Sequence, residues 1–346
     1  MIGIGLIGYG YWGPLLARNF AALPGARLAG ICELDATRRA LATQRHPGVR
    51  VVNHIDGLLN DPDIAAVVVA TPVASHFELA HACLVAGRHV LVEKPLAASL
   101  TAAEALCAEA ERHGRVLLVD HTFLYSSAVR QMKATLAAGE LGDIHYYDSV
   151  RTNLGRFRSD VDVLWDLASH DLAIIHDLFA DAPTEIQATG FTRTPGEPLE
   201  LAYLTLRWGG ARIAHIHVSW LTPIKVRRTL VGGSRGMLVW DDIDPDTKVR
   251  IYALAADDGP TGTADAEPSQ LRISYRRGAM RAPWLPIAEP LHDLAEHFVA
   301  CITTGCAPRS GGRSGAQVLR WLEAARISLD RGGVPVDLAS VLRPQG

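Results

Sequence analysis

Asp166 and His170 are candidates for proton transfer because of their residue types and their spacing. They lie four positions apart, so a helix would present both side chains from one face. An imidazole accepts or donates a proton near neutral pH, and a nearby carboxylate would orient it and stabilise its protonated form. An ion pair on a helix surface is the structural alternative. His176 and Asp177 add possible metal ligands, but the spacing fixes no third ligand, and we expect no metal.

Lys94 is a second candidate, because it lies between Glu93 and Pro95 at the end of the apolar run His89–Glu93. Such a run is typical of a strand buried in a parallel sheet. Pro95 restricts Lys94 to extended geometry. Ligands bind open α/β sheets at the carboxyl ends of the strands, so Lys94 would lie beside a bound ligand. A solvated lysine at a strand end is the alternative.

Three glycines near the N-terminus have the pattern of a dinucleotide-binding turn. Gly8, Gly10 and Gly13 are spaced G-x-G-x-x-G between an apolar strand, Met1–Ile7, and a helical stretch, Leu15–Ala22. The first glycine permits a tight turn, the second a close approach to a pyrophosphate, and the third close helix–sheet packing. The helix N-terminus offers its N–H groups to the phosphates. The pattern therefore predicts a nucleotide site.

Glu33 ends the second predicted strand, Ala26–Glu33, and could accept hydrogen bonds from the ribose hydroxyls of adenosine. A carboxylate repels a 2′-phosphate, so the residue favours NAD over NADP. Arg38 and Arg39 lie on the helix that follows, and they leave NADP possible.

The elements that must position these residues alternate between strands and helices over residues 1–120. Alternating βα units with apolar strands predict right-handed crossovers and a doubly wound parallel sheet, the Rossmann arrangement. Gly8–Gly13, Glu33, Thr71-Pro72 and Glu93-Lys94 all follow predicted strands. They should therefore meet at one edge of this sheet.

From residue 121 the pattern changes to short strands and turns, which indicates a second α/β domain with an open, mostly antiparallel sheet. The expected strands are Ile144–Arg151, Leu201–Arg207, Arg212–Trp220, Val226–Val231 and Met237–Trp240. The expected helices are Ser126–Ala138, Val163–Phe179, Leu291–Thr304 and Ser314–Leu329. His215 and His217 alternate on one strand and share a face, which indicates a sheet face or a subunit contact.

The composition excludes several classes of protein. The 346 residues are 48% hydrophobic and 21% charged, which allows about two domains with a sizeable core. A net charge of -3 argues against a nucleic-acid partner. No apolar run approaches the roughly 20 residues that span a bilayer, and the N-terminus lacks the features of a signal peptide, so we expect a cytoplasmic protein without a membrane partner. The five cysteines, Cys301 and Cys306 included, show no metal-like spacing and suggest reduced thiols.

Several motifs in this order resemble the glucose–fructose oxidoreductase / inositol dehydrogenase (Gfo/Idh/MocA) family. They are Gly8-Tyr-Gly-Tyr-Trp-Gly13, Ala70-Thr-Pro72 followed by His76, Glu93-Lys-Pro95, and Asp166-Leu-Ala-Ser-His170. The resemblance covers nearly the whole chain. More narrowly, Tyr11-Trp-Gly-Pro14, His121-Thr-Phe-Leu-Tyr125 and Asp162-Val-Leu-Trp-Asp166 resemble a subgroup associated with sugar-nucleotide and polysaccharide pathways.

The resemblance implies hydride transfer between a nicotinamide and a hydroxyl-bearing carbon of a sugar or cyclitol. It implies that Lys94 and His170 are catalytic and that Asp166 assists, while the choice of proton acceptor between Lys94 and His170 stays open. Cofactor contacts are implied for Gly8, Gly10, Tyr11, Trp12, Gly13, Glu33, Thr71, Pro72, His76, Glu93 and Lys94. It also implies a nucleotide domain over residues 1–120 and a substrate and oligomer domain over residues 121–346. The outer face of the second sheet would join a homodimer or homotetramer.

The expected substrate is a sugar, and the subgroup motifs favour a nucleotide-linked hexose. Arg156 and Arg158, with Arg151, could meet a diphosphate, because arginine forks match phosphate oxygens. A solvated basic loop is the alternative for these residues. An inositol or free-sugar dehydrogenase stays open, as does a regulator that binds NAD without catalysis.

Overall fold

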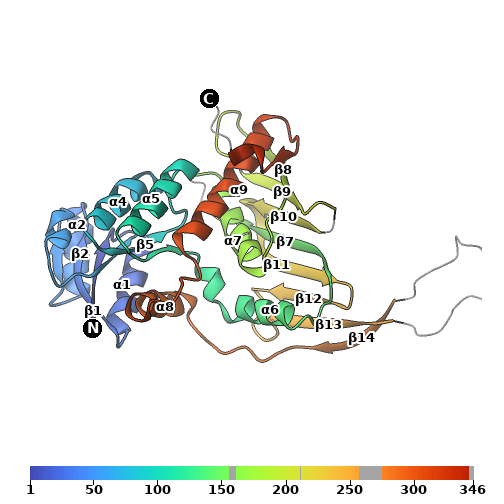
Figure 1. Ribbon diagram of the computed structural model, residues 1–346, viewed down its shortest axis with the longest axis horizontal. Helices are drawn as coiled ribbons and strands as arrows, with labels where there is room; N and C mark the ends of the chain where they lie inside the picture. The colour runs from blue at the N-terminus through green and yellow to red at the C-terminus, as the bar shows by residue number, and fades with distance from the viewer. Residues whose placement is uncertain (156–160, 211, 257–274, 343–346) are drawn as a thin grey trace, which may run out of the picture. The chain divides into compact units, whose positions relative to one another are not determined.

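Two sheets organise the chain, and each belongs to one of two compact units in the computed structural model (Figure 1). The structure describes residues 1–155, 161–210, 212–256 and 275–342. Unit 1 comprises residues 1–127, 169–180 and 287–326, and unit 2 comprises residues 128–168, 181–286 and 327–346.

The sheet of unit 1 is parallel and six-stranded, in the order β3-β2-β1-β4-β5-β6. Its strands are β1 (Ile2–Ile7), β2 (Ala26–Cys32), β3 (Arg50–Val52), β4 (Ala66–Val69), β5 (His89–Glu93) and β6 (Leu117–Asp120). The strand order reverses at β1, so right-handed crossovers place the helices of the two halves on opposite faces. The doubly wound sheet predicted from the sequence is confirmed.

The helices of unit 1 begin where the sequence offers caps. The Asp35 carboxylate accepts from the N–H of Arg38 at 2.8 Å, and Ser99 Oγ accepts from the N–H of Ala102 at 3.2 Å. The unit contains α1 (Gly13–Ala22), α2 (Ala36–Arg45), α3 (Asp56–Leu59), η1 (Val73–Ser75), α4 (His76–Val85), α5 (Leu100–Arg112), η2 (Thr122–Tyr125), α7 (Ser169–Leu178), α8 (Pro290–Thr304) and most of α9 (Gly312–Asp330).

Unit 1 takes α7 and α8 from the second half of the sequence, so its limits differ from a division at residue 120. Helix α8 packs on α1, where the rings of Phe20 and Phe298 meet edge to face with centroids 6.3 Å apart. After α8, the carbonyl of Ser310 accepts from the N–H of Val119 at 2.7 Å. The nucleotide-type sheet is therefore completed by residues far along the chain.

The sheet of unit 2 has the order β14-β13-β12-β11-β7-β10-β9-β8-β15 and is mostly antiparallel, as predicted. Its strands are β7 (Ile144–Leu154), β8 (Glu185–Phe191), β9 (Leu201–Arg207), β10 (Ile213–Ser219), β11 (Leu221–Gly233), β12 (Gly236–Asp241), β13 (Val249–Ala256), β14 (Tyr275–Arg281) and β15 (Val336–Asp337). Strands β7 and β10 pair in parallel. The remaining elements here are α6 (Ser127–Ala137), η3 (Leu164–Ala168) and a 3-10 turn, η5 (Ser340–Leu342).

Some strands of unit 2 are absent from the sequence prediction. Strand β8 alternates buried Ile186 and Ala188 with polar neighbours, but it also contains Gly190, which weakens the strand pattern. Strands β13 and β14 flank the stretch 257–274. The polar, glycine-bearing stretch Asp257–Ser269 is typical of a surface loop in sequence, and it lies outside the described residues.

The helix expected over Val163–Phe179 forms in two parts. Leu164–Ala168 is a π turn, and α7 follows at Ser169. The Asp162 carboxylate caps the π turn by accepting from the N–H of Trp165 at 3.0 Å. A π turn closes hydrogen bonds five residues apart, so the four-residue spacing of Asp166 and His170 does not fix one shared face as it would in a regular α-helix. The single α-helix predicted here is corrected to this two-part form.

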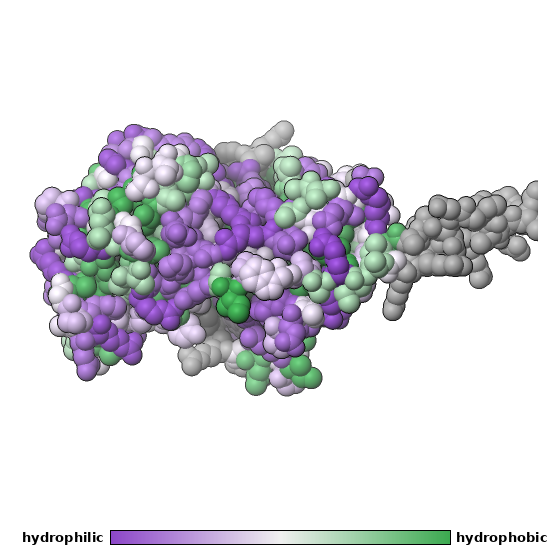
Figure 2. All heavy atoms as spheres, turned by 90° about the horizontal axis from the view of Figure 1, so that it is seen from below, coloured by the Kyte–Doolittle hydropathy of each residue, from purple (hydrophilic) through white to green (hydrophobic). Residues whose placement is uncertain are grey.

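Hydrophilic side chains cover most of the face shown in Figure 2, and apolar side chains gather there only in small separate groups. Within the described residues, no helix is long and apolar enough to cross a membrane.

Candidate functional site

The glycine turn after β1 is shaped by steric limits that differ between its glycines. Gly8 has a φ of 94°, and a Cβ there would lie 2.4 Å from the carbonyl oxygen of Ala70. A Cβ on Gly13 would lie 2.4 Å from the carbonyl oxygen of Gly8. A Cβ on Gly10 would meet nothing closer than Arg38 Nη1, at 3.9 Å. Packing therefore requires Gly8 and Gly13, whereas the space at Gly10 suits an approaching pyrophosphate.

Helix α1 begins directly after this turn without a side-chain cap. The N-cap residue, Trp12, accepts through its carbonyl from the N–H groups of Leu15 and Leu16, both at 3.0 Å. Tyr11 and Trp12 are exposed on the turn, with rings edge to face and centroids 5.2 Å apart. An uncapped helix N-terminus next to open backbone is the arrangement that binds phosphate groups.

Glu33 lies directly after β2 and is buried against the glycine turn. One carboxylate oxygen accepts from the N–H of Tyr9 at 2.6 Å, and the other accepts from the N–H of Asp35 at 2.9 Å. Arg39 turns away from it and donates to the carbonyls of Glu33 and Leu34. The two amides fix the carboxylate beside the turn, where it keeps further lone pairs for ribose hydroxyls.

His76 joins the turn after β4 to the segment after β5. Its Nδ1 lies 2.8 Å from the carbonyl oxygen of Pro95, and its Nε2 lies 2.9 Å from the carbonyl oxygen of Thr71. Burial lowers the pKa of His76, whereas the carbonyls of Pro95 and Thr71 raise it. A neutral ring has a single N–H, so it donates to one of these two carbonyls at a time. Pro72 is exposed at the start of the same turn. His76 thereby positions Thr71 and the Lys94-Pro95 peptide, which is cis; a direct contact of His76 with a cofactor stays a prediction.

Glu93 and Asp120 form a buried acid pair at the ends of neighbouring strands. They face each other in the register of β5 and β6. Burial and the neighbouring Asp120 carboxylate raise the pKa of Glu93 well above its ordinary value, and burial raises the pKa of Asp120. Thr122 donates its hydroxyl to Asp120. Two neighbouring buried carboxylates repel each other, which favours a pair that holds one proton.

Lys94 follows this acid pair and is half-buried. Its positive charge partly offsets the raised pKa values of Glu93 and Asp120 and adds to the lowering of the pKa of His121, as expected for a neighbour of all three. His121 is buried, and burial, Lys94 and His176 together lower its pKa to about 3. The surroundings therefore supply one anion and a neutral imidazole beside the Lys94 ammonium.

His170, near the start of α7, lies against η2, the turn that follows β6. Its imidazole meets the ring of Phe123 with centroids 4.9 Å apart and planes inclined at 70°. The ring is half-buried. Both Lys94 and His170 therefore belong to unit 1 and follow, or pack on, the carboxyl ends of its strands.

Asp166 belongs to unit 2, where Trp220 holds its side chain. The indole N–H of Trp220, which is buried, donates to Asp166 Oδ2 at 3.2 Å. The main chain of Trp220 donates to the carbonyl of Glu200 at 2.8 Å and accepts from the N–H of Gly155 at 3.1 Å. The orientation of Asp166 is thus set by a tryptophan between β10 and β11. Its assistance to His170 stays a prediction.

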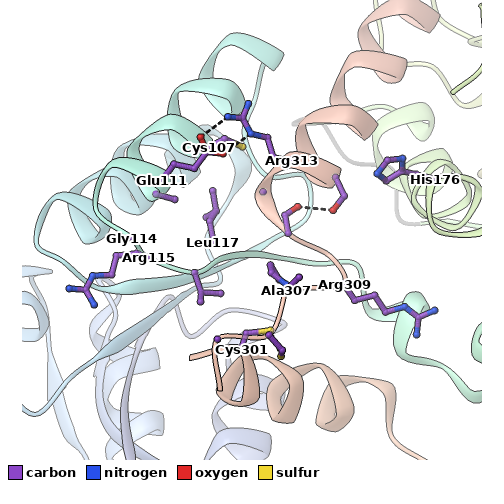
Figure 3. Close-up of a pocket in the computed structure, with 18 residues that line it drawn as sticks. Cys107, Glu111, Gly114, Arg115, Leu117, His176, Cys301, Ala307, Arg309 and Arg313 are labelled. Atoms are coloured by element: carbon purple, nitrogen blue, oxygen red, sulfur yellow. Dashed lines mark hydrogen bonds and ion pairs between the residues drawn. The ribbon is translucent and has the colours of Figure 1, made fainter. Parts of the chain in front are cut away.

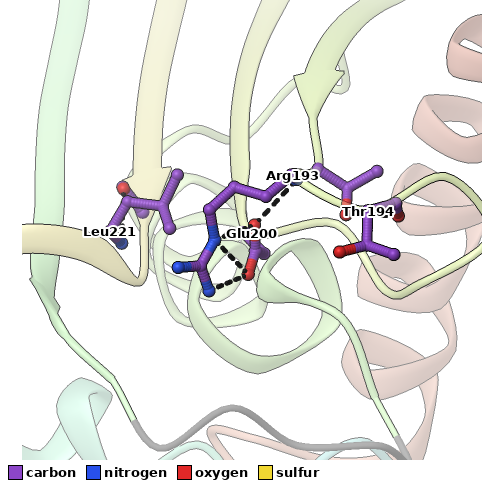
Figure 4. A network of polar contacts seen from close by, with 6 residues as sticks. Arg193, Thr194, Glu200 and Leu221 are labelled. Atoms are coloured by element: carbon purple, nitrogen blue, oxygen red, sulfur yellow. Dashed lines mark hydrogen bonds and ion pairs between the residues drawn. The ribbon is translucent and has the colours of Figure 1, made fainter.

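An arginine–carboxylate clamp continues this arrangement in unit 2 (Figure 4). Arg193 donates from Nε to both oxygens of Glu200 at 3.0 Å and from Nη2 to one of them at 2.6 Å. The N–H of Arg193 adds a bond to Glu200 at 2.9 Å. Arg151 is buried in β7. Arg156 and Arg158, predicted to contact a diphosphate, lie outside the described residues.

Sequence reasoning missed three residues of the site. Asp120 ends the apolar strand next to β5, and this position at a strand end is the same signal that marks Glu93. His121 follows at once and appeared only within a family motif. Trp220 gave no signal, because nothing in its spacing links it to Asp166.

Two family models match the chain in sequence. The model described as an oxidoreductase family with an NAD-binding Rossmann fold matches residues 2–121, and the GFO/IDH/MocA C-terminal domain matches residues 129–239. UDP-N-acetylglucosamine 3-dehydrogenase of Acidithiobacillus ferrooxidans is 31% identical over 338 residues, which cover 94% of this chain and 96% of the relative. The chain belongs to the Gfo/Idh/MocA family.

Two further similarities agree with this assignment. The scyllo-inositol 2-dehydrogenase (NADP(+)) of Bacillus subtilis is 29% identical over 94% of this chain and 93% of its own. A solved structure from Magnetospirillum magnetotacticum, described as an oxidoreductase, has a TM-score of 0.79 at 30% identity and covers 93% of this chain and 99% of its own. As a Gfo/Idh/MocA member, the chain is an NAD(P)-dependent dehydrogenase. The open backbone at Gly10, the uncapped α1 and the fixed Glu33 carboxylate fit NAD.

Proposed function

We propose that this Gfo/Idh/MocA protein oxidises a hydroxyl-bearing carbon of a nucleotide-linked hexose with NAD. The observation that carries the proposal is the set of groups that follow parallel strands of unit 1: the glycine turn after β1, Glu33 after β2, and Lys94 after β5 beside its acid pair. Bound NAD supplies the hydride acceptor. The protein supplies the residues that orient the hydroxyl and remove its proton.

In this proposal Lys94 binds the substrate hydroxyl and stabilises the oxygen as its negative charge develops. The acid pair Glu93 and Asp120 offers a counter-charge to the Lys94 side chain and restrains its position. His170 accepts the hydroxyl proton, and its edge-to-face contact with Phe123 limits the rotation of the ring. Asp166, held by Trp220, stabilises the imidazolium.

The nucleotide-linked substrate is supported by one relative and by the composition of one loop. The relative named UDP-N-acetylglucosamine 3-dehydrogenase aligns over nearly the whole chain. Arg156 and Arg158 would bind the diphosphate. If charge reversal at both positions left the Michaelis constant for a sugar nucleotide unchanged, this contact would be wrong.

A panel of substrates tests the proposal. Reduction of NAD is followed spectroscopically with UDP-linked hexoses, their free sugars and cyclitols, using wild type, Lys94→Ala and His170→Ala. We expect turnover with a UDP-linked hexose and a loss of at least about 100-fold in kcat in either variant, with NADH binding retained. Absence of turnover with every hydroxyl substrate, alongside tight NADH binding, contradicts the proposal and favours an NAD-binding regulator.

A cyclitol or free-sugar dehydrogenase is the second candidate, and the relative named for scyllo-inositol favours it. The two candidates differ only in the part of the substrate beyond the reacting carbon. A kcat/KM at least tenfold higher for a cyclitol than for any UDP-linked hexose selects the second candidate.

We also propose that the exposed face of the unit 2 sheet joins two copies of the chain. Tyr203 on β9 stacks on His217 and His215 of β10, with centroids 4.5 and 5.9 Å away, and the three rings form an aromatic strip. Light scattering of wild type and of Tyr203→Glu tests this: a dimer or tetramer that dissociates in the variant supports it, and a monomeric wild type rejects it.

A further inference from the structure

The end of α8 and the loop after it bring together three side chains that bind soft metal ions. His297 and Cys301 are four residues apart on α8, and Cys306 follows the helix in the sequence. Gly305, with a φ of 72°, ends the helix in a left-handed turn that returns Cys306 toward Cys301. One ligand atom from each residue lies within 4.8 Å of the other two.

Two of the three distances between these atoms match the edges of a metal tetrahedron. The two sulfurs are 3.5 Å apart, and Cys301 Sγ is 3.4 Å from His297 Nε2. Zinc bonds of about 2.3 Å to sulfur and about 2.0–2.1 Å to nitrogen place two sulfurs about 3.8 Å apart and a sulfur about 3.5 Å from a nitrogen. A small shift of Cys306 would therefore complete three ligands around one ion.

The imidazole already presents the nitrogen that such an ion requires. His297 Nε2 accepts from the N–H of Arg309 at 3.0 Å, so the proton of the neutral ring resides on Nδ1 and the Nε2 lone pair faces the thiols. An ion would take this lone pair from the Arg309 amide. The geometry thus offers the correct tautomer at the cost of one backbone hydrogen bond.

The cluster opens on a cavity within unit 1 that leaves room for a fourth ligand. The cavity has a volume of about 630 Å³, and its lining includes Cys301, Cys306 and Cys107 (Figure 3). Two of the three arginines that line it are paired with carboxylates: Arg309 with Asp177 at 2.6 Å and Arg313 with Glu111 at 2.7 Å. Cys301 is buried and Cys306 is exposed, so an ion can enter from the cavity side and be held on a rigid helix.

We propose that His297, Cys301 and Cys306 form a site for a thiolate-binding divalent ion of the zinc type, with water as its fourth ligand. Cysteine thiolates and imidazole are the ligands that zinc prefers. The ion would fasten the loop after Gly305 to α8. The proposal is independent of the substrate and of the catalytic roles given above.

Cobalt(II) binding to the reduced, chelator-treated full-length protein tests this site, because thiolate-bound tetrahedral cobalt has characteristic charge-transfer and d–d absorption bands. We expect one ion per chain, displaced by zinc, and a thermal midpoint raised by zinc. Cys306→Ser and His297→Gln should each weaken binding at least tenfold. Cys107→Ala, which alters another cysteine of the same cavity, should leave binding unchanged.

Circular dichroism of the ion-free variants checks that they are folded, and the exposed Cys306 makes its serine variant the decisive one. The proposal is wrong if no thiolate band appears, if the band persists undiminished in Cys306→Ser, or if Cys107→Ala removes it. It is also wrong if Cys301 and Cys306 form a disulfide under the same reducing conditions in place of binding the ion.

Discussion

The indole of Trp220 donates its N–H to Asp166 at 3.2 Å, so a residue between two strands of unit 2 orients a carboxylate of the candidate catalytic set. Trp220→Phe removes the N–H donor and keeps a smaller aromatic ring at the same buried position. We expect kcat to fall roughly tenfold, since a hydrogen bond to a charged group is worth about 1.5–3 kcal/mol, with the Michaelis constant for NAD unchanged. Steady-state kinetics measures both constants.

Trp208→Phe is the matched control for that change. Trp208 is also buried in unit 2 and donates its indole N–H to a backbone carbonyl, that of Asp181, at 3.1 Å. Its variant should lose a hydrogen bond without loss of kcat. Equal losses of kcat in the two variants would indicate a general effect on unit 2 and not the positioning of Asp166.

Cofactor preference depends on Glu33, whose carboxylate is fixed by the amides of Tyr9 and Asp35. Glu33→Gln removes the charge and keeps an acceptor. We expect the ratio of kcat/KM for NAD to that for NADP to fall at least tenfold, because repulsion of a 2′-phosphate disappears while a ribose contact weakens. The kinetics of Glu78→Gln, an exposed position on α4, should match those of wild type. An unchanged ratio in Glu33→Gln contradicts the assignment.

Alanine at two glycines of the same turn should have different effects, on folding stability at Gly8 and on NADH binding at Gly10. At Gly8 the positive φ and the nearby Ala70 carbonyl oppose a side chain, so Gly8→Ala should lower the free energy of unfolding by at least about 2 kcal/mol. Gly10→Ala meets open space and should fold like wild type, but its methyl group should weaken NADH binding at least tenfold. Denaturant unfolding and fluorescence titration distinguish the two. Normal NADH affinity in Gly10→Ala would show that the pyrophosphate lies elsewhere.

The acid pair predicts a dependence of stability on pH. Glu93 has a raised pKa in the folded protein, so between its ordinary value of 4.5 and the raised value the folded state keeps a proton that the unfolded state releases. Stability should therefore fall as the pH rises through this range. Glu93→Gln mimics the protonated acid and should flatten the fall while retaining activity. Asp120→Asn removes the charge that faces Lys94 and should lower kcat.

His121 should make stability depend on pH in the direction opposite to Glu93. Its pKa falls from an ordinary 6.5 to about 3 on folding, so between these values the unfolded state binds a proton that the folded state excludes. Stability should be lost as the pH falls through this window, by up to about 1.4 kcal/mol per pH unit. Neither ring nitrogen has a hydrogen-bond partner among the described residues, so His121→Leu should fold and reduce this slope. A slope equal to that of wild type would show that other groups dominate.

The fold of unit 1 was predictable because its signals are local. Runs such as Ala66–Val69 and Val90–Val92 are buried on both faces, and Asp35 and Ser99 are residue types that cap helices. The candidate site residues Gly8, Glu33 and Lys94 were chosen by the rule that ligands bind at strand ends. That rule concerns topology and needs no side-chain contacts.

The remaining features depend on contacts between distant parts of the chain. Trp220 and Asp166 are 54 positions apart, and no spacing rule links them. The π turn at Leu164–Ala168 has the composition of an ordinary α-helix, so the sequence does not predict its π geometry. The sequence did not indicate a group formed by His297, Cys301 and Cys306. The two cysteines are brought together by the turn at the end of α8, and their spacing does not predict that turn.

The packing of α8 on α1 also has a consequence for the order of synthesis. Phe298 contacts Phe20, and Ser310 bonds to the edge strand β6, so the dinucleotide sheet lacks part of its cover until nearly the whole chain has left the ribosome. The first 127 residues emerge with an apolar helix face still bare. The start of unit 1 is thus translated first, but the unit can complete its packing only late in synthesis. Chaperones would bind it while it is incompletely folded.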